Sequence, residues 1–229
     1  MMPYVITLTG ASQCGKSKVI EILHKIGQDK SYLDFSPVTF QKYTTRAFRD
    51  YEINSIENGE AHRLDQRPVV GDYNNNDELE VEALSIEKMR AFHKLQCDLA
   101  YEQFGDRYGL RLDDLYAHLK KGETPIVILN DVRTVEDVKT KLGGQCFSIF
   151  VFREAPNLEH FLREGKKRGE STETTKIRFQ KASAIYRIYI ENIHVFDKLI
   201  LNVEHDTSSL ERILRHLIEH MSKPAVAFS

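Results

Sequence analysis

The sequence predicts an α/β fold in which a doubly wound, mainly parallel sheet is flanked by helices. Segments with the pattern of strands alternate along the chain with segments of helical periodicity, and this alternation is typical of parallel strands joined by crossover helices. The runs at residues 125–129 and 146–152 are almost continuously apolar, as expected of parallel strands that helices cover on both faces. With 229 residues and no evident linker, the chain is expected to form one domain with appended pieces.

A glycine-rich stretch follows the first strand-like run. Residues 10–17 read GASQCGKS and fit the pattern G-x-x-x-x-G-K-[ST] between the apolar run 4–8 and a helix expected to end near residue 26. In such a loop the backbone N–H groups and the helix N-terminus hold the phosphates of a nucleotide, the lysine reaches the β- and γ-oxygens, and the serine ligates Mg²⁺. The sequence therefore predicts a P-loop NTPase fold that binds a nucleoside triphosphate. The residues expected to hold ATP and Mg²⁺ are Gly10, Ser12, Gly15, Lys16 and Ser17, with Ser17 as the metal ligand.

The first half of the chain continues with a second strand and a long irregular region. Residues 38–40 are apolar, and residues 41–52 alternate β-branched or aromatic residues with polar ones. This pattern favours a strand that ends in a loop carrying Arg46 and Arg49. From residue 54 onward the chain is rich in Asn, Asp, Gly and Glu and lacks periodicity, which predicts a long loop or insertion over about residues 54–84.

Helices and strands alternate more regularly in the second half. Apolar periodicity, capping residues and glycine stops indicate the helices, and short apolar runs indicate the strands between them. The expected helices cover residues 85–95, 112–119, 134–142, 156–169, 171–192 and 207–221, and the expected strands cover residues 125–129, 146–152 and 198–202.

The composition argues against several classes of partner. The net charge is −2 and charged residues make up 29% of the chain, so no overall basic field would attract nucleic acid or an anionic membrane surface. No apolar run reaches the length of about 18 residues that a membrane span needs, and no leader-like segment opens the chain, so the cytoplasm is the expected compartment. The three cysteines, Cys14, Cys97 and Cys146, lack the spacing of a disulfide framework or a zinc site.

Two groups of basic residues indicate phosphate chemistry. In phosphoryl transfer the negative charge spreads over the oxygens of the moving group, so a kinase needs cations on both the donor and the acceptor. Arg46 and Arg49 suit the bidentate grip of arginine on an acceptor phosphate. A second basic segment suits a lid that closes over the donor phosphates, while an ordinary solvated surface is the alternative for both groups. The basic residues of this second segment are Arg163, Lys166, Lys167, Arg168 and Arg178.

The order of these features resembles the guanylate kinase family of nucleoside monophosphate kinases, over about residues 4–221 without the insertion. Residues 44–49, TTRAFR, resemble the family segment T-T-R-x-P-R, whose two arginines hold the acceptor phosphate, and Glu52 stands where the family loop carries a glutamate. Tyr108 and Gly109 resemble the Y-G pair of the family, whose tyrosine hydroxyl reaches the monophosphate.

Two later motifs extend the resemblance to the donor side. Residues 168–171, RGES, followed by Arg178, resemble the family lid, and residues 197–202, DKLILN, resemble a late D-x-x-I-x-N strand. In the family the asparagine of that strand, here Asn202, lies near the adenine of ATP. The implied organisation is a kinase domain over residues 1–222, an acceptor-binding lobe at about 38–109, a lid at about 163–178 and a tail at 223–229.

The chain departs from the family pattern at positions that read the acceptor base. Lys42 stands where the family has a serine that helps to read guanine. The family's guanine-reading acid lies about nine residues before the Y-G tyrosine, a spacing that falls on Leu99 here, with Asp98 and Glu102 as the nearby carboxylates.

Further departures affect the metal site and the acceptor lobe. Asn130 stands where the family has an aspartate after the central strand, which leaves its neighbour Asp131 as the candidate to hold Mg²⁺ or its waters. Phe48 replaces the proline of the arginine segment, and the insertion falls within the acceptor lobe.

The resemblance implies a kinase that moves the γ-phosphoryl group of Mg·ATP onto a phosphorylated small molecule, most simply a nucleoside monophosphate such as GMP or dGMP. Two alternatives stay open. One is a ribose 1,5-bisphosphate phosphokinase, which the chain also resembles in Asn130, and the other is a guanylate kinase-like module that binds a protein or nucleotide without catalysis. The residues expected to act catalytically are Lys16, Arg46, Arg49, Arg163, Arg168 and Arg178, and those expected to bind the acceptor are Lys42, Arg46, Arg49, Asp98, Glu102, Tyr108 and Asp131.

Overall fold

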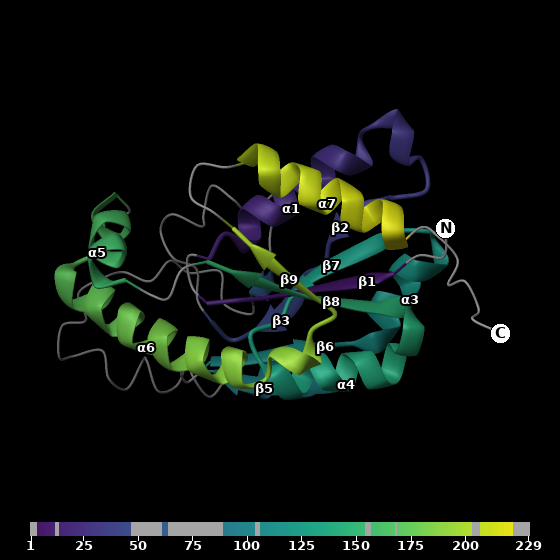
Figure 1. Cartoon of the computed structure of the whole chain (residues 1–229). Helices are drawn as coiled ribbons and strands as arrows, with labels where there is room; N and C mark the ends of the chain where they lie inside the picture. The colour runs from purple at the N-terminus through teal and green to yellow at the C-terminus, as the bar shows by residue number, and fades with distance from the viewer. Residues whose placement is uncertain are drawn as a thin grey trace. The chain divides into compact units, whose positions relative to one another are not determined.

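The computed structural model describes residues 4–11, 14–46, 61–63, 89–103, 106–153, 157–167, 169–202 and 207–221. By its contacts the chain divides into two compact units, which are described separately (Figure 1). The first unit comprises Met1–Val38 and His118–Ser229, and the second comprises Thr39–Ala117. Among the predicted site residues, Ser12, Arg49 and Arg168 lie outside the described residues, as do Phe48, Glu52 and most of the predicted insertion.

A five-stranded sheet in the order β2-β7-β1-β8-β9 forms the centre of the first unit. Its strands are β1 (Val5–Thr9), β2 (Pro37–Thr39), β7 (Thr124–Ile128), β8 (Cys146–Phe152) and β9 (Lys198–Leu201). The central strand β1 is buried along its whole length and runs parallel to both neighbours, with Ile6 paired to Ile126 on one side and to Phe147 on the other. The prediction of an α/β fold with a parallel sheet is therefore confirmed.

Helices cover both faces of this sheet. In Figure 1, α1 and α7 lie on one face, while α4 and α6 lie on the other. Leu23 of α1 and Leu214 of α7 are completely buried in the hydrophobic core that these two helices share with β1 and β7. Apart from a short helical stretch at residues 89–94, the helices among the described residues are α1 (Lys16–Gly27), η1 (Lys30–Tyr32), α3 (Leu112–Lys120), α4 (Val132–Leu142), η3 (Gly143–Gln145), α5 (Leu158–Lys167), α6 (Thr172–Glu191), η4 (Ile193–Val195) and α7 (Thr207–Met221).

Helix α4 begins two residues before the predicted start at Thr134. The side chain of Asp131 accepts a hydrogen bond from the backbone N–H of Thr134, so Asp131 rather than Thr134 caps the helix.

Within the described part of the chain, no helix is both long and apolar enough to cross a bilayer.

The second unit contains a four-stranded sheet in the order β4-β3-β6-β5. Strands β5 and β6 form an antiparallel hairpin, β6 pairs antiparallel with β3, and β3 pairs parallel with β4. A helical turn at residues 89–94 precedes the hairpin and lies within the helix predicted at residues 85–95. The strands are β3 (Lys42–Thr44), β4 (Ala61–Arg63), β5 (Leu99–Gln103) and β6 (Asp106–Leu110).

The hairpin of β5 and β6 was missing from the sequence-based assignment. Polar residues such as Glu102 and Arg107 occupy one face of each strand, so neither strand forms the continuous apolar run that identified the strands of the parallel sheet. A strand that is buried on just one face shows alternating apolar and polar residues over a few positions. This pattern identifies a strand less clearly than a continuous apolar run does. The structure thus adds an antiparallel pair to the predicted architecture.

Asp197 ties three elements of the first unit together. Its Oδ2 accepts hydrogen bonds from the backbone N and the Oγ of Ser148, both at 2.8 Å, and its Oδ1 accepts one from Lys139 Nζ at 2.7 Å. Burial raises the pKa of the Asp197 carboxyl, but the hydrogen bonds from Lys139 and Ser148 lower it by more, so the pKa lies below its ordinary value. The carboxylate thereby joins β8 and α4 to the segment that precedes β9.

The substitution Asp197→Asn should lower the free energy of unfolding by about 1–3 kcal/mol at neutral pH, because it weakens hydrogen bonds to a charged group. Since the pKa in the folded protein is depressed, the carboxylate contributes stability above the ordinary carboxyl pKa and loses it as the pH falls through the folded pKa. Urea unfolding from about pH 7 to about pH 3 should therefore show the difference between variant and wild type shrinking.

Asp137→Asn is the matched control, because Asp137 is an exposed aspartate on α4. It should change the stability by less than about 0.5 kcal/mol. A difference for Asp197→Asn that stays constant with pH would contradict the role of the carboxylate.

Candidate phosphate-binding loop and acceptor face

The predicted phosphate loop joins the carboxyl end of β1 to the start of α1. Gly15 precedes α1 with φ 96°, in the left-handed region that favours glycine. A Cβ atom on Gly15 would overlap the side-chain amide of Asn202, and one on Gly10 would overlap Cys14 Sγ and the carbonyl oxygen of Val151. Both motif glycines are therefore required by close packing, and Gly15 also by its backbone conformation.

The Lys16 ammonium is held against this loop. Its Nζ donates hydrogen bonds to the carbonyl oxygens of Gly10, at 2.8 Å, and Ala11, at 2.9 Å, and lies 3.8 Å from Cys14 Sγ. The next residue, Ser17, is exposed in the first turn of α1. The structure therefore brings Gly10, Gly15 and Lys16 together in one loop with a cation on it, as a phosphate site requires.

Asn202 braces the phosphate loop from the end of β9. Its Nδ2 donates to the carbonyl oxygen of Cys14 at 2.8 Å, and its backbone N donates to Phe152 O at 2.7 Å. The family resemblance implied a position near adenine, whereas the structure shows the Asn202 side chain in contact with the loop itself. Its role toward ATP stays a prediction, and the bracing contact is an additional role that the sequence did not indicate.

The carboxyl end of β7 carries the two residues considered for the metal. Asp131 Oδ2 accepts hydrogen bonds from the N and Oγ1 of Thr134, at 2.8 and 2.6 Å, and so caps α4. The carbonyl oxygen of Asn130 accepts a hydrogen bond of 2.6 Å from the hydroxyl of Tyr189 on α6. Among the described residues no cluster of three or more His, Cys, Asp or Glu side chains could hold a metal ion, and the role of Asp131 toward Mg²⁺ stays a prediction.

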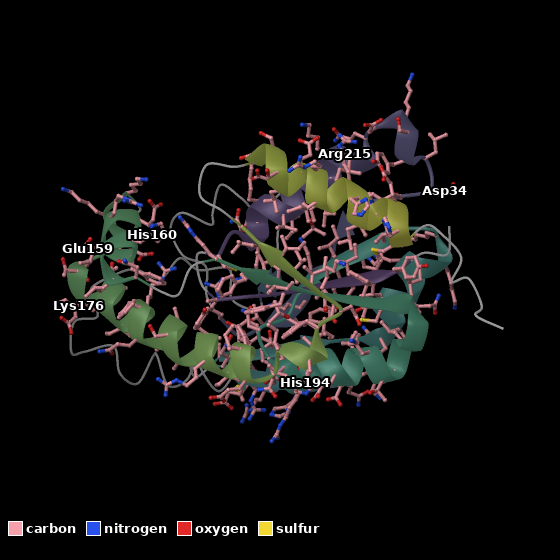
Figure 2. All side chains as sticks on the ribbon, in the orientation of Figure 1. Asp34, Glu159, His160, Lys176, His194 and Arg215 are labelled. Atoms are coloured by element: carbon pink, nitrogen blue, oxygen red, sulfur yellow. The ribbon has the colours of Figure 1, made fainter. Side chains whose placement is uncertain are left out.

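Arg153 and His160 form a basic group with Arg163. Arg153 directly follows β8, and His160 and Arg163 lie on α5; Figure 2 labels His160. Arg153 Nη1 lies 3.2 Å from His160 Nε2, and Arg163 Nη2 lies 3.0 Å from His160 Nδ1. A neutral imidazole accepts a hydrogen bond at one ring nitrogen only, so at most one guanidinium group can donate to His160. The other guanidinium group faces a ring N–H, an arrangement of donors that suits an anion.

The motifs of the sequence do not include Arg153 or His160. The available signal was the place of Arg153, immediately after a strand of the parallel sheet, because α/β proteins bind ligands at the carboxyl ends of such strands. His160 gave no such signal, since a single histidine on a polar helix is usually solvated.

Helices α5 and α6, which contain parts of the segment predicted to be a lid, form a closely packed pair, and the lid role of this segment stays a prediction. Gly165 is buried, and a Cβ atom there would overlap the side chain of Thr175. Because glycine has no Cβ atom, the two helices can approach closely at this position. Arg178 of α6 forms an ion pair with Glu170, and both side chains are largely buried, with exposures of 15% and 12%. In the structure Arg178 therefore has Glu170 as a carboxylate partner, while Arg163 lies beside His160 and 3.7 Å from the carboxylate of Glu164.

A different set of predicted residues gathers in the second unit. Lys42 Nζ lies 3.3 Å from the hydroxyl of Tyr101 and 5.0 Å from the ring centroid of Tyr108, and the two tyrosine rings stack with centroids 5.1 Å apart. Lys42 and Tyr108 are buried, with exposures of 5% and 8%. We call the three residues Lys42, Tyr101 and Tyr108 the acceptor face.

Arg46 lies just beyond β3, in the loop where the arginine segment was predicted. Its backbone N donates to Thr44 Oγ1 at 3.1 Å. Thr45 and Arg107 exchange hydrogen bonds, from Thr45 N to the Arg107 carbonyl at 3.1 Å and from Arg107 N to Thr45 Oγ1 at 2.9 Å. These contacts fix the backbone at the start of the arginine segment.

The two candidate guanine-reading carboxylates do not join the acceptor face. Asp98 accepts a hydrogen bond of 2.8 Å from the backbone N of Leu112, at the start of α3. Glu102 pairs across the hairpin with Arg107, and its side chain is 61% exposed. Since side chains alternate along a strand, Glu102 points away from the face that holds Tyr101. The acceptor role of both carboxylates stays a prediction.

Comparison with solved structures agrees with this fold. The structure is similar to guanylate kinase from Anaplasma phagocytophilum, with a TM-score of 0.51 at 18% sequence identity over 97% of this chain and 88% of that chain. Dephospho-CoA kinase from Campylobacter jejuni gives a TM-score of 0.42 at 15% identity over 98% and 100% of the two chains. Shikimate kinase from Acinetobacter baumannii gives 0.44 at 10% identity over 97% and 96%. No family model and no curated protein matches the sequence. At 18% identity the likeness to the guanylate kinase concerns the fold alone, an α/β fold with a parallel sheet flanked by helices.

The substitution Gly15→Ala should weaken ATP binding at least about tenfold, because the new Cβ meets the Asn202 amide and the φ of this residue is unfavourable for alanine. Titration of purified protein with a fluorescent ATP analogue measures the effect. Gly122→Ala is the matched control, since Gly122 also has a positive φ, 79°, but a Cβ there meets nothing within 4 Å. The control should lose some stability and keep its affinity for ATP; equal loss of affinity in both variants would contradict a specific role of Gly15.

Proposed function

We propose that this protein is an ATP-dependent phosphotransferase that moves the γ-phosphoryl group of Mg·ATP onto a phosphorylated small molecule. The observation that carries this proposal is the Lys16 ammonium, held within a glycine loop at the carboxyl end of the central strand. The P-loop kinase fold supports the same conclusion. We assign the reaction to the cytoplasm, with no nucleic acid or membrane as partner.

On the donor side, the loop and its cations supply charge stabilisation. Lys16 would stabilise the γ-phosphoryl group, and Ser17 would ligate Mg²⁺, with Asp131 as a further candidate near the metal. Gly10, Ser12, Gly15 and Asn202 would shape the site for ATP. Arg163, Arg168 and Arg178 would approach the transferring group, and the contacts of Arg153 with His160 favour adding Arg153 to this set.

On the acceptor side, the second unit would hold the phosphate that receives the phosphoryl group. Arg46, Arg49 and Tyr108 would bind this phosphate, and its oxygen would attack the γ-phosphorus while ADP leaves. No general base is needed, because a phosphate oxygen is already nucleophilic. A nucleoside monophosphate such as GMP or dGMP is the first candidate for the acceptor.

A ribose 1,5-bisphosphate acceptor is the second candidate. The observations that favour it are the Lys42 ammonium on the acceptor face and the positions of Asp98 and Glu102, which do not lie there. Such an acceptor needs no carboxylate to read a base.

The proposed function predicts release of ADP from Mg·ATP in the presence of one acceptor and loss of that release in Lys16→Ala. The rate constant should fall by about 10²- to 10³-fold, the usual effect of removing a charge-stabilising donor. A coupled assay with GMP, dGMP, AMP, CMP, UMP, dTMP and ribose 1,5-bisphosphate measures the turnover.

Lys18→Ala is the matched control, because Lys18 lies on the same helix and pairs with Glu21 at the surface. It should leave turnover unchanged. ATP binding without turnover of any acceptor would contradict the phosphotransferase and favour a non-catalytic nucleotide-binding module.

A further inference from the structure

The side chain of Asn202 reaches the phosphate loop from the carboxyl end of β9. Its Nδ2 donates a hydrogen bond of 2.8 Å to the carbonyl oxygen of Cys14, and its amide lies so close to Gly15 that a Cβ atom there would overlap it. Cys14 and Gly15 directly precede Lys16, whose ammonium is held against the loop. Asn202 therefore contacts the part of the loop that leads into the lysine of the motif.

Backbone contacts hold Asn202 in this position. Its backbone N donates to Phe152 O at 2.7 Å, which continues the parallel pairing of β9 with β8. Ile200, two residues earlier, is buried in the hydrophobic core of the first unit. Because an asparagine side chain is short and adopts few rotamers, a fixed backbone leaves its amide little freedom. The sheet thus places the donor that binds Cys14.

The hydrogen bond to Cys14 fixes one peptide group of the loop. A peptide group is planar and trans, so the carbonyl of Cys14 and the N–H of Gly15 point in opposite directions. While Asn202 holds this carbonyl, the N–H of Gly15 is directed away from Asn202. Backbone N–H groups are the donors with which such a loop binds phosphates. Asn202 thereby sets the direction of one N–H donor of the loop.

The conformation of Gly15 explains why such a restraint matters. Its φ is 96°, and glycine adopts positive and negative φ about equally readily. The backbone alone would therefore allow the peptide group before Gly15 to rotate, which would exchange the positions of its N–H and its carbonyl. A carbonyl oxygen turned toward a phosphate would repel it. The hydrogen bond from Asn202 selects one of the two orientations.

This restraint concerns the triphosphate of a nucleotide rather than its base. The resemblance to the guanylate kinase family implies a position of Asn202 near adenine, whereas the Nδ2 of Asn202 is directed at the loop backbone. A contact with the base would depend on which base is bound. The shape of the phosphate loop, in contrast, affects every nucleoside triphosphate alike.

We propose that Asn202 is a positioning residue, which holds the peptide group between Cys14 and Gly15 in the orientation that binds a triphosphate, whatever base the nucleotide carries. This inference rests on the proposed function, because it takes the loop to be the site of the donor nucleotide. Asn202 acts through the loop and takes no part in the transfer of the phosphoryl group.

The affinities of three ligands for the wild-type protein and for Asn202→Ala test this role. The ligands are ATP, GTP and inorganic tripolyphosphate, each with Mg²⁺, and calorimetry measures their binding. Asn202→Ala should weaken the binding of all three by the same factor of about 3 to 10, the range expected for the loss of one hydrogen bond. A loss for ATP that neither GTP nor tripolyphosphate shares would overturn the proposal, and so would an unchanged affinity for ATP.

A second variant and a matched control sharpen this test. Asn202→Asp keeps the shape of the side chain and an acceptor oxygen but lacks the N–H donor, so it should bind the ligands at least as weakly as Asn202→Ala; wild-type affinity in this variant would overturn the proposal. Asn192→Ala is the control, because Asn192 Nδ2 also donates to a backbone carbonyl at 2.8 Å, that of Ile188 in α6. It should bind each ligand as the wild type does. Thermal unfolding establishes that each variant is folded.

The coupled assay separates a positioning role from a purely structural one and from the proposed function. Asn202→Ala should raise the KM for ATP by the same factor as the loss of affinity and leave the KM for the acceptor within about twofold. A purely structural residue would instead lower the amount of folded enzyme, and hence the apparent kcat, with both KM values unchanged, and this outcome would overturn the proposal. Absence of turnover with every acceptor, together with the expected loss of triphosphate binding in Asn202→Ala, would contradict the phosphotransferase alone.

Discussion

The parallel hydrogen bonding of β1 between β7 and β8 is the constraint on which the first unit depends. Because the three strands run in the same direction, their carboxyl ends lie at one edge of the sheet, and the segments that follow them leave from that edge. The phosphate loop follows β1, Asn130 and Asp131 follow β7, and Arg153 follows β8. A central strand buried on both faces tolerates little displacement, so the position of the glycine loop is set by the hydrophobic core beneath it.

The shape of the loop depends on contacts within and around it. Lys16 bonds to two carbonyl oxygens of the loop, and Asn202 bonds to a third from the end of β9. Three carbonyl groups of the loop are thus satisfied by side chains, as buried backbone polar groups require. Asn202 thereby links the described part of the loop to β9 at the edge of the sheet.

The parallel sheet and the phosphate loop could be predicted from the sequence because their signals are local. Apolar runs identified the buried strands, and the G-x-x-x-x-G-K-[ST] pattern identified the loop. The hairpin of β5 and β6 could not be found in this way, since only its register with β3 shows which residues share a face. The sequence leaves the choice between Asp98 and Glu102 open for the same reason, because a shift of one residue reverses the direction of a side chain. The contact of Asn202 with Cys14 joins parts of the chain that are 188 residues apart, for which the sequence offers no spacing rule.

The attachment of α6 to the sheet has a mechanical consequence. Near its C-terminal end the helix is anchored by Tyr189. The ring of Tyr189 packs edge-on against the ring of Phe150, with the two ring centroids 5.6 Å apart, and its hydroxyl donates a hydrogen bond to the carbonyl oxygen of Asn130. Arg178 lies 11 residues earlier in a helix that contains no glycine or proline, about 16 Å along the axis from this anchor. A tilt of about 10° around Tyr189 would displace Arg178 by about 3 Å, the length of one hydrogen bond. A small rotation of the helix at the sheet would therefore be enough to make or break a hydrogen bond of Arg178.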